Sequence, residues 1–376
     1  MDGNEYIDYR TGHGSMILGQ ANPAIVTAVQ DQMEKGTHLS ASTELEVEWS
    51  KLIRRLVPSA EKMRFHSSGT EANMMAFKML RAFTGKSKIV KFYGSFHGWS
   101  DYAYINLDED QHRRFGIPEA VSETMVVVPR QDLDALDQAL ASDDDIAAVV
   151  YEGNEIAPPE FIIGMRGVTE QRKVLLFVDE VVSGFRWSRA GCQGRIGIQP
   201  DISTFAKILA GGLPGGCVAG RAEIIDTVGE GGIAHPGTFN ANPISAAAGV
   251  AALSIIENEP ILEVAEAMAG RLRNGINDVL RRLEVPGGAY GVASTVKTSL
   301  GVPVDTGYEY ATPDTKTGTP ITADTKVLLK QALINEGIWG DPGDGHLSAT
   351  HTTDDIDATL EKYEAALMEV RKSGAI

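Results

Sequence analysis

The sequence is poor in cysteine, since Cys192 and Cys217 are the only two in 376 residues. They form no metal-ligand spacing and no disulfide framework, which predicts a reducing compartment. Basic side chains are also scarce, with 34 against 51 acidic ones and a net charge of −17. Because binding to nucleic acid needs clustered Lys and Arg, we expect no nucleic-acid partner.

Long apolar runs are missing as well. The sequence has no apolar stretch of the roughly 18 residues that span a bilayer, and its N-terminus lacks the basic region and apolar core of a signal peptide. We therefore expect a soluble, cytoplasmic protein without a membrane partner. The length allows two domains and a buried core that needs no disulfide or metal.

Buried strands and amphipathic helices alternate in the first part of the chain. Continuous apolar runs at 88–92, 146–151 and 174–178 are typical of strands buried on both faces of a parallel sheet. Apolar residues at the i, i+3, i+4 spacing predict a helix before the first of them. These residues are Ala72, Met75, Ala76, Met79, Leu80 and Phe83. The alternation predicts a doubly wound α/β domain.

The pattern changes beyond about residue 250. We predict a long helix over 261–283, a strand over 293–302, a loop over 307–322 and an amphipathic closing helix over 354–372. A second, smaller domain is expected there.

A candidate phosphate site lies at residues 67–71, just before the first predicted helix. Unpaired N–H groups at a helix start attract phosphate, Gly69 lets the backbone approach closely, and the hydroxyls of Ser68 and Thr70 add donors. The same residues also suit an ordinary N-cap with an acidic first turn. This motif alone leaves both interpretations open.

Two further candidates carry charge. Asp179 follows a predicted strand, and ligands of open α/β sheets bind beyond the carboxyl ends of strands, although such an Asp can also cap a turn. Lys207 lies among small and apolar residues, where desolvation lowers the pKa of an amine and makes it nucleophilic. An ordinary solvated loop lysine is the alternative.

Together these residues predict a site for pyridoxal 5′-phosphate (PLP), which needs a phosphate cradle, a carboxylate opposite the pyridine nitrogen and a lysine at the aldehyde. Other sites are disfavoured. The first glycine of a P-loop would fall on Leu80, and neither a G-x-G-x-x-G turn nor an H-E-x-x-H helix occurs. His346 and His351 are better explained as loop residues than as a metal site.

The chain resembles the class III, or ω-, aminotransferases, and most of all the branch that contains glutamate-1-semialdehyde aminomutase. The resemblance covers nearly the whole chain. It is carried by Lys207 and by the motifs at 2–9, 68–72, 94–98, 179–181, 183–186, 235–243 and 347–352. It implies the PLP-dependent type I (aspartate aminotransferase-like) fold, with a large PLP-binding domain over 38–254. A small domain would be formed by both chain ends, 1–37 and 255–376.

The resemblance also assigns roles around the cofactor ring. Lys207 would hold PLP as an aldimine and Asp179 would pair with the pyridine nitrogen. Val181 and Phe96 would cover the two faces of the ring.

The same likeness assigns the phosphate site and the partner. Gly69 and Thr70 would hold the phosphate, and Thr238 would reach it from the neighbouring subunit, so that a homodimer shares its active sites. The other cofactor-binding residues that it implies are Ser68, His97, Glu152 and Asn154.

The chain departs from the family pattern in several places. Phe96 replaces the usual Tyr, which loses a hydroxyl contact but keeps stacking. The loop at 152–159 is short, and Asn154 is either the amide donor to the ring hydroxyl or a plain turn residue. The aminomutase branch has Glu before Ala-Gly-Phe near the C-terminus, where this chain has Pro-Gly-Asp-Gly-His at 342–346. The carboxylate is therefore lost or shifted by one residue, to Asp344, which argues against the aminomutase reaction specifically. Family members have a few dozen residues before the point where this sequence begins, and those residues help to form the wall of the substrate pocket. We expect them to be missing here.

These features predict a PLP-dependent aminotransferase that moves an amino group from an amino acid or amine to a keto acid by a ping-pong mechanism. Glutamate-1-semialdehyde 2,1-aminomutase is the alternative within the fold, and a non-catalytic α/β binding protein is the alternative outside enzymes. A nicotinamide-dependent dehydrogenase is disfavoured, because the glycine motif that binds the dinucleotide phosphates is missing. Arg186 suits either a substrate carboxylate or a structural salt bridge.

Overall fold

The computed structural model describes residues 3–105, 116–314 and 316–376. Asp2 of the N-terminal motif and Thr315 of the predicted loop lie outside them. The chain forms two compact units. The sheet unit comprises residues 21–155 and 159–258, and the end unit comprises residues up to 20, 156–158 and 259–376. The division at 37/38 and 254/255 that the resemblance implies stays a prediction.

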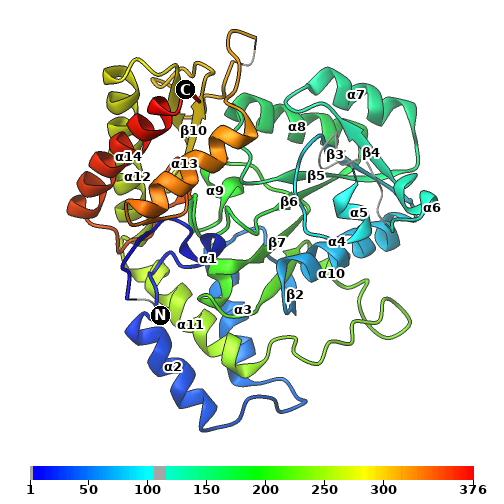
Figure 1. The fold of residues 1–376 in the computed structure, drawn as a ribbon. Coiled ribbons are helices and arrows are strands. Elements are labelled where there is room, and N and C mark those ends of the chain that lie inside the picture. Colours follow the sequence, from blue (N-terminus) through cyan, green and yellow to red (C-terminus); the bar gives the residue numbers. More distant parts are fainter. Residues whose placement is uncertain (1–2, 106–115, 315) are drawn as a thin grey trace. The chain divides into compact units, whose positions relative to one another are not determined.

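A mostly parallel sheet forms the centre of the sheet unit (Figure 1). The strand order is β2-β8-β7-β6-β5-β3-β4, and only β8 runs antiparallel to its neighbours. The strands are β2 (Lys62–His66), β3 (Lys88–Phe92), β4 (Met125–Val128), β5 (Ile146–Glu152), β6 (Leu175–Asp179), β7 (Ile202–Ala206) and β8 (Gly216–Gly220). The strands predicted at 88–92, 146–151 and 174–178 are therefore confirmed as β3, β5 and β6, and the mostly parallel α/β fold is confirmed with them.

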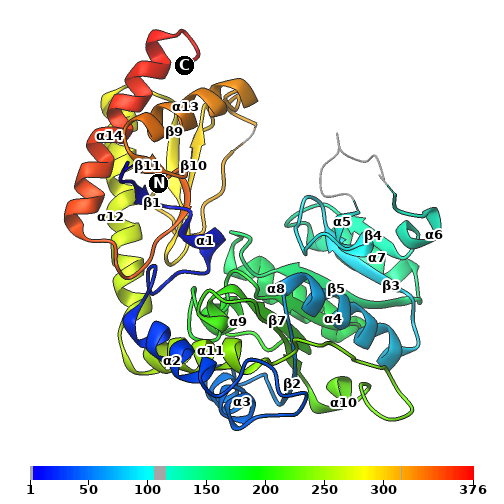
Figure 2. The ribbon, with the colours of Figure 1, turned by 60° about the horizontal axis from the view of Figure 1, so that its bottom comes forward.

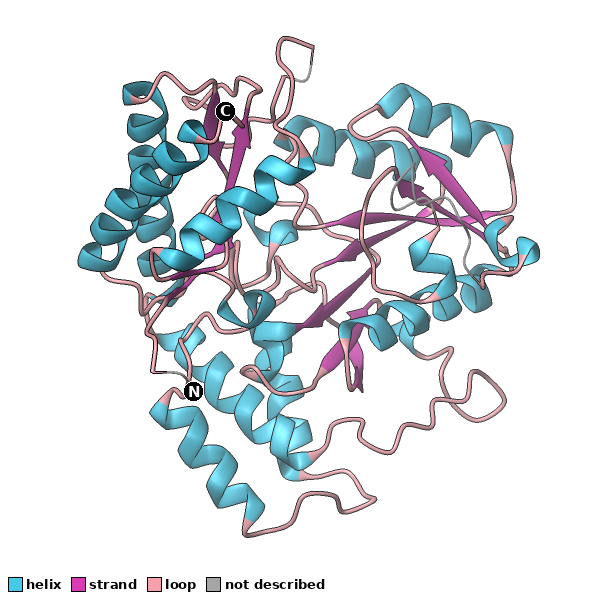
Figure 3. Ribbon diagram, in the orientation of Figure 1, coloured by secondary structure: helices cyan, strands magenta, loops and turns pink. Residues whose placement is uncertain are grey.

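Helices cover both faces of this sheet (Figures 1 and 3). The crossover through α4 (Gly69–Thr84) moves along the sheet in one direction, whereas those through α7 (Leu133–Ser142) and α8 (Pro159–Arg172) return. Since parallel crossovers are right-handed, the two directions place helices on opposite faces. The helix predicted from the apolar spacing is confirmed as α4. Ala72, Ala76, Met79 and Leu80 are buried, whereas Phe83 at the end of the helix is 37% exposed.

The remaining helices of the sheet unit are shorter or lie beside the sheet. They are α2 (Pro23–Met33), α3 (Glu44–Leu56), α5 (Asp101–Tyr104), α6 (Glu119–Ser122), α9 (Cys192–Ile196), the 3₁₀ turn η2 (Lys207–Ala210), α10 (Ala222–Ile225) and α11 (Pro243–Asn258). Of these, α2 and α3 both pack against α11.

The end unit has its own apolar core, around a three-stranded antiparallel sheet in the order β12-β10-β9. The helix α12 lies against β9 and β10 and beside α14 (Figure 2). The helices and strands of the end unit are β1 (Ile7–Asp8), α1 (Thr11–Gly14), α12 (Ile261–Arg282), β9 (Gly287–Tyr290), β10 (Thr295–Leu300), α13 (Ala323–Asn335), β11 (Ile338–Trp339), β12 (Asp344–His346) and α14 (Thr353–Lys372). The helices and the strand predicted in this region are confirmed to within a few residues.

Candidate active site

Three of the predicted site residues lie at the carboxyl ends of neighbouring strands. Glu152 ends β5 and is the register partner of Asp179, which ends β6. Asp179 is in turn the partner of Thr204 in β7, and Lys207 follows the end of β7. Because these strands are parallel, all three residues lie at one edge of the sheet, where ligands of open α/β sheets bind.

The candidate phosphate segment starts at the same edge. His66, the last residue of β2, and Ala206, the last residue of β7, are both register partners of Gly216 in β8. A Cβ added to Gly69 would lie 2.9 Å from both γ-carbons of Val181 and 3.3 Å from the Cβ of Ala206. The first turn of α4 therefore lies directly against Val181 and the strand that leads to Lys207.

Ser68 has the capping role that the sequence left open. Its Oγ accepts a hydrogen bond from the backbone N–H of Glu71 at 3.2 Å, and Glu71 Oε2 accepts one from Ser67 N at 2.7 Å. Gly98, with φ of +95°, packs against Thr70, since an added Cβ would lie 2.6 Å from the Thr70 hydroxyl. The residue pattern thus serves as an N-cap, and the phosphate function assigned to Gly69 and Thr70 stays a prediction.

Asp179 is buried and fully hydrogen-bonded. Its Oδ2 accepts from Asn73 Nδ2 and lies 2.8 Å from His97 Nδ1, and its Oδ1 accepts from the backbone N–H of Val181 at 3.0 Å. The neighbouring Glu180 has a different role, because its carboxylate accepts from Ser183 and from the backbone of Cys192 and Gln193. The two adjacent acids therefore separate into one that faces the sheet edge and one that holds the 183–193 segment.

Lys207 has a strained backbone and a half-buried side chain. Its φ is +53°, which lies in the left-handed region that side chains other than glycine rarely adopt. Burial lowers the pKa of Lys207, with Asp179 opposing the shift and Arg186 adding to it. These interactions place Lys207 within electrostatic reach of Asp179. Arg186 is 1% exposed, and burial lowers its pKa to about 9.

Phe96 and Asn154 also belong to this edge of the sheet. The backbone N–H of Phe96 donates to Glu152 Oε2 at 3.0 Å, and its ring is 52% exposed. Asn154 follows Gly153, whose N–H donates to the Asp179 carbonyl at 2.9 Å. Thr238 is exposed in the segment before α11, and no hydrogen bond among the described residues joins it to this edge. Its role toward a neighbouring subunit stays a prediction.

Sequence comparison identifies the family. The family model of class-III aminotransferases matches residues 1–290. The chain belongs to the class-III aminotransferase family. The glutamate-1-semialdehyde 2,1-aminomutases of Methanothrix thermoacetophila and Methanococcoides burtonii are 38% and 36% identical to it, over 97% and 98% of the chain and 86% and 89% of those proteins. An ω-transaminase from Sphaerobacter thermophilus superposes with a TM-score of 0.88 at 30% identity, over 98% of this chain and 88% of that one.

Membership of this family makes the chain a PLP enzyme, and the residues at the sheet edge fit that cofactor. A half-buried amine, a buried carboxylate at the end of the neighbouring strand and a helix N-terminus with glycine supply the three kinds of group that PLP needs. Among the described residues, Asn154 Oδ1 is a buried polar atom without a hydrogen-bond partner. Its neighbour Gly153 is the residue that contacts the backbone of Asp179.

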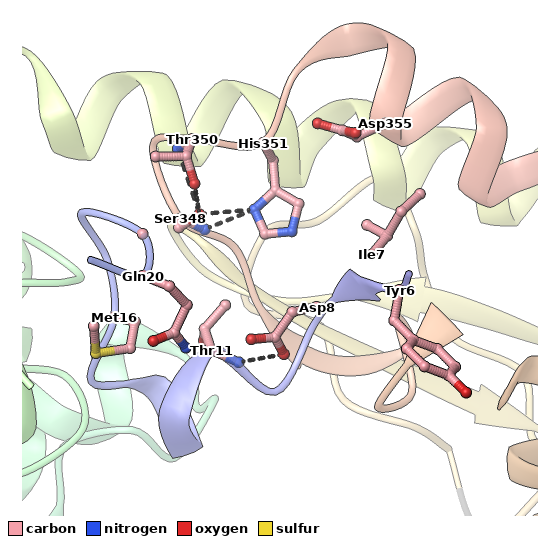
Figure 4. Close-up of a pocket in the computed structure, with 11 residues that line it drawn as sticks. Tyr6, Ile7, Asp8, Thr11, Met16, Gln20, Ser348, Thr350, His351 and Asp355 are labelled. Carbon is pink, nitrogen blue, oxygen red and sulfur yellow. Dashed lines mark hydrogen bonds between the residues drawn. The ribbon is translucent and has the colours of Figure 1, made fainter. Parts of the chain in front are cut away.

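The end-unit motifs of the resemblance meet around a cavity of about 220 Å³ (Figure 4). Residues from 6–20 and from 348–355 line it. Its polar groups serve the local structure: His351 Nδ1 accepts from the Ser348 N–H at 3.1 Å, and Asp355 caps α14. No group of three or more metal-binding side chains occurs in the part of the chain that the structure describes. Likewise, no helix of that part is long and apolar enough to cross a membrane.

Asn73 was missed by sequence reasoning. It lies on the buried face of α4, one turn after Gly69, and is 2% exposed. Its Nδ2 donates both to Asp179 Oδ2 and to the His97 carbonyl, at 2.8 and 2.9 Å. The signal that was available is a polar residue within the apolar face of a predicted helix, since buried polar groups need partners.

Proposed function

We propose that this enzyme is an aminotransferase that moves an amino group from an amino acid or amine to a keto acid in two half-reactions. The observation that carries the proposal is the placement of Lys207 and Asp179 at the ends of neighbouring parallel strands, with the pKa of the Lys207 amine lowered by burial. A lowered pKa leaves more of the amine unprotonated and nucleophilic near neutral pH.

Each residue at the edge has a distinct task. Bound PLP supplies an aldehyde and an electron-accepting ring. The Lys207 amine would hold the cofactor and would carry the proton to and from the substrate Cα. The Asp179 carboxylate would hold a proton on the ring nitrogen, and Asn73 and His97 fix the orientation of that carboxylate.

The same elements provide the residues for the two faces of the cofactor ring and for its phosphate group. Val181, packed against Gly69, would support one ring face, and Phe96 would close the other. Gly69 and Thr70 would present the N-terminus of α4 to the phosphate. Asn154, whose buried Oδ1 has no hydrogen-bond partner among the described residues, would contact the ring hydroxyl.

The aminomutase reaction is the second candidate, because the curated relatives reported above carry that name. Asp344, the acid nearest to the position of the branch's glutamate, forms an ion pair with Lys297 across the β10–β12 ladder and is half exposed. Its carboxylate is thus used in a surface pair of the end unit, which favours the aminotransferase.

A panel of donors and acceptors separates the two reactions. We expect turnover of amino acids or amines only when pyruvate or 2-oxoglutarate is present, with parallel double-reciprocal plots, because the two half-reactions are separated by product release. Product formation is followed by chromatography, with each substrate omitted in turn as the control. Turnover of glutamate 1-semialdehyde with no second substrate would overturn the proposal in favour of the aminomutase.

The homodimer is part of the same proposal, with Thr238 of each subunit serving the other subunit's phosphate site. The exposure of Thr238 and of the neighbouring Phe239, which is 61% exposed, supports a function outside the subunit that carries them. The cysteines Cys192 and Cys217 are both buried and free, which supports a reducing, cytoplasmic location.

Mixed dimers test the shared site directly. We expect Thr238→Ala to weaken PLP binding by about tenfold, the size of one hydrogen bond to a charged group. A dimer of one Thr238→Ala subunit and one Lys207→Ala subunit would then contain one fully intact site, because both changes fall in the other site. Differently tagged subunits are co-expressed and purified on both tags. Half of the wild-type activity per mixed dimer is expected, with the wild-type dependence on PLP concentration. If that remaining activity instead required about tenfold more PLP, Thr238 would act within its own subunit.

A further inference from the structure

The side chain of His97 is wholly buried, with both ring nitrogens in hydrogen bonds. Nδ1 lies 2.8 Å from Asp179 Oδ2, and Nε2 lies 3.1 Å from Ser95 Oγ. The imidazole is 0% exposed, so water cannot supply or remove a partner. The protonation of the ring therefore depends on the roles of these two oxygens.

Ser95 has only one proton to give. Its Oγ lies 2.7 Å from the Phe92 carbonyl oxygen, which can only accept, so the hydroxyl proton lies in that bond. Two oxygens at this distance without a proton between them would repel. Ser95 Oγ consequently offers a lone pair to His97, and Nε2 must carry a proton to donate.

Asp179 likewise requires a proton on the other ring nitrogen of His97, Nδ1. The Asn73 amide is fixed, because its Nδ2 lies 2.9 Å from the His97 carbonyl oxygen, which can only accept, and the same Nδ2 donates to Asp179 Oδ2 at 2.8 Å. With Val181 N–H donating as well, Asp179 accepts hydrogen bonds at both oxygens, which stabilises its ionised form. An ionised carboxylate needs a donor at Nδ1.

We propose that Ser95 is a positioning residue that holds His97 as a doubly protonated imidazolium, paired with an ionised Asp179. The pair keeps Asp179 charged before the cofactor arrives, so that the carboxylate is ready for the protonated ring nitrogen. Lys207 is the other cation that acts on Asp179. This role for Asp179 rests on the proposed function, but the protonation of His97 does not.

The test is made on the enzyme without cofactor, so that failure of the proposed function cannot hide the result. Protein labelled with ¹⁵N in its histidine rings is studied by NMR at neutral pH, and the His97 signals are identified by their loss in His97→Gln. We expect both ring nitrogens of His97 to be protonated in the wild type. In Ser95→Ala, Nε2 has no acceptor, and we expect it to lose its proton. Ser95→Thr keeps the hydroxyl and should restore the wild-type spectrum.

Ser100→Ala is the matched control, because Ser100 is a buried serine of the same loop whose hydroxyl has no partner among the described residues. It should leave the His97 signals unchanged. As a second readout, the Kd for PLP should rise by about tenfold in Ser95→Ala and stay constant in Ser100→Ala. A neutral His97 in the wild type, or an unchanged His97 spectrum in a folded Ser95→Ala, would overturn the proposal. If Ser95→Ala does not fold, the wild-type spectrum alone still shows whether both ring nitrogens of His97 are protonated.

Discussion

Replacing Lys207 by alanine is expected to lower kcat/KM for transamination by at least about 10³-fold while the protein stays folded. The change removes both the covalent attachment point and the group that moves the Cα proton. The fold should survive, because alanine fits the half-buried position and accepts the same left-handed backbone about as well as lysine. Turnover is measured with the best donor of the panel, and attachment is measured by borohydride reduction and mass spectrometry.

Lys173 provides a close control for this change. It is also a lysine with a positive φ, +56°, but it is exposed at the end of α8. Lys173→Ala should keep wild-type turnover and the reduced adduct on residue 207. Near-normal turnover of Lys207→Ala, or an adduct on another lysine of the wild type, would refute the assignment.

The sequence predicted the sheet well where local composition decides the structure. Strands β5 and β6 are buried on both faces, so each is a continuous apolar run up to its last residue. Strand β3 is buried too, but it includes Lys91, whose amine donates to two backbone carbonyls. Phe83 shows the limit of this reasoning, because it fits the spacing of the apolar face and is nevertheless 37% exposed.

The candidate site was predictable by residue type and unpredictable in its supporting contacts. Lys207 and Asp179 stand out because a charge in an apolar setting needs a partner or a function. Asn73 and Ser95 contact the same site through α4 and the turn after β3, segments that are far from Asp179 in the chain. Their roles depend on tertiary hydrogen bonds, which no local spacing encodes.

Asp179→Asn is expected to lower kcat by at least about 10²-fold, with the cofactor still attached to Lys207. An amide cannot balance the charge of a protonated ring nitrogen, so the ring accepts electrons less well. The amide also places an NH₂ group among the donors from Asn73, His97 and Val181. Activity and covalent attachment are measured on the same samples, since only the first should collapse. The loss should also exceed that of Asn154→Ala, which removes one contact and no charge.

The variant Asp201→Asn is the control that distinguishes an effect on catalysis from an effect on stability. It is as buried as Asp179, at 5% exposed, and is held by Arg166 and Arg221 where β7 begins, at the opposite edge of the same sheet. Asp201→Asn should therefore lower the melting temperature, because it weakens two ion pairs of a buried carboxylate with partly exposed arginines, and leave kcat of the folded enzyme unchanged. If Asp179→Asn lost only stability in the same way, its carboxylate would be a structural acid like Asp201. A loss of kcat in a folded Asp179→Asn with a normal adduct on Lys207 instead requires the charge of Asp179 in the chemical step.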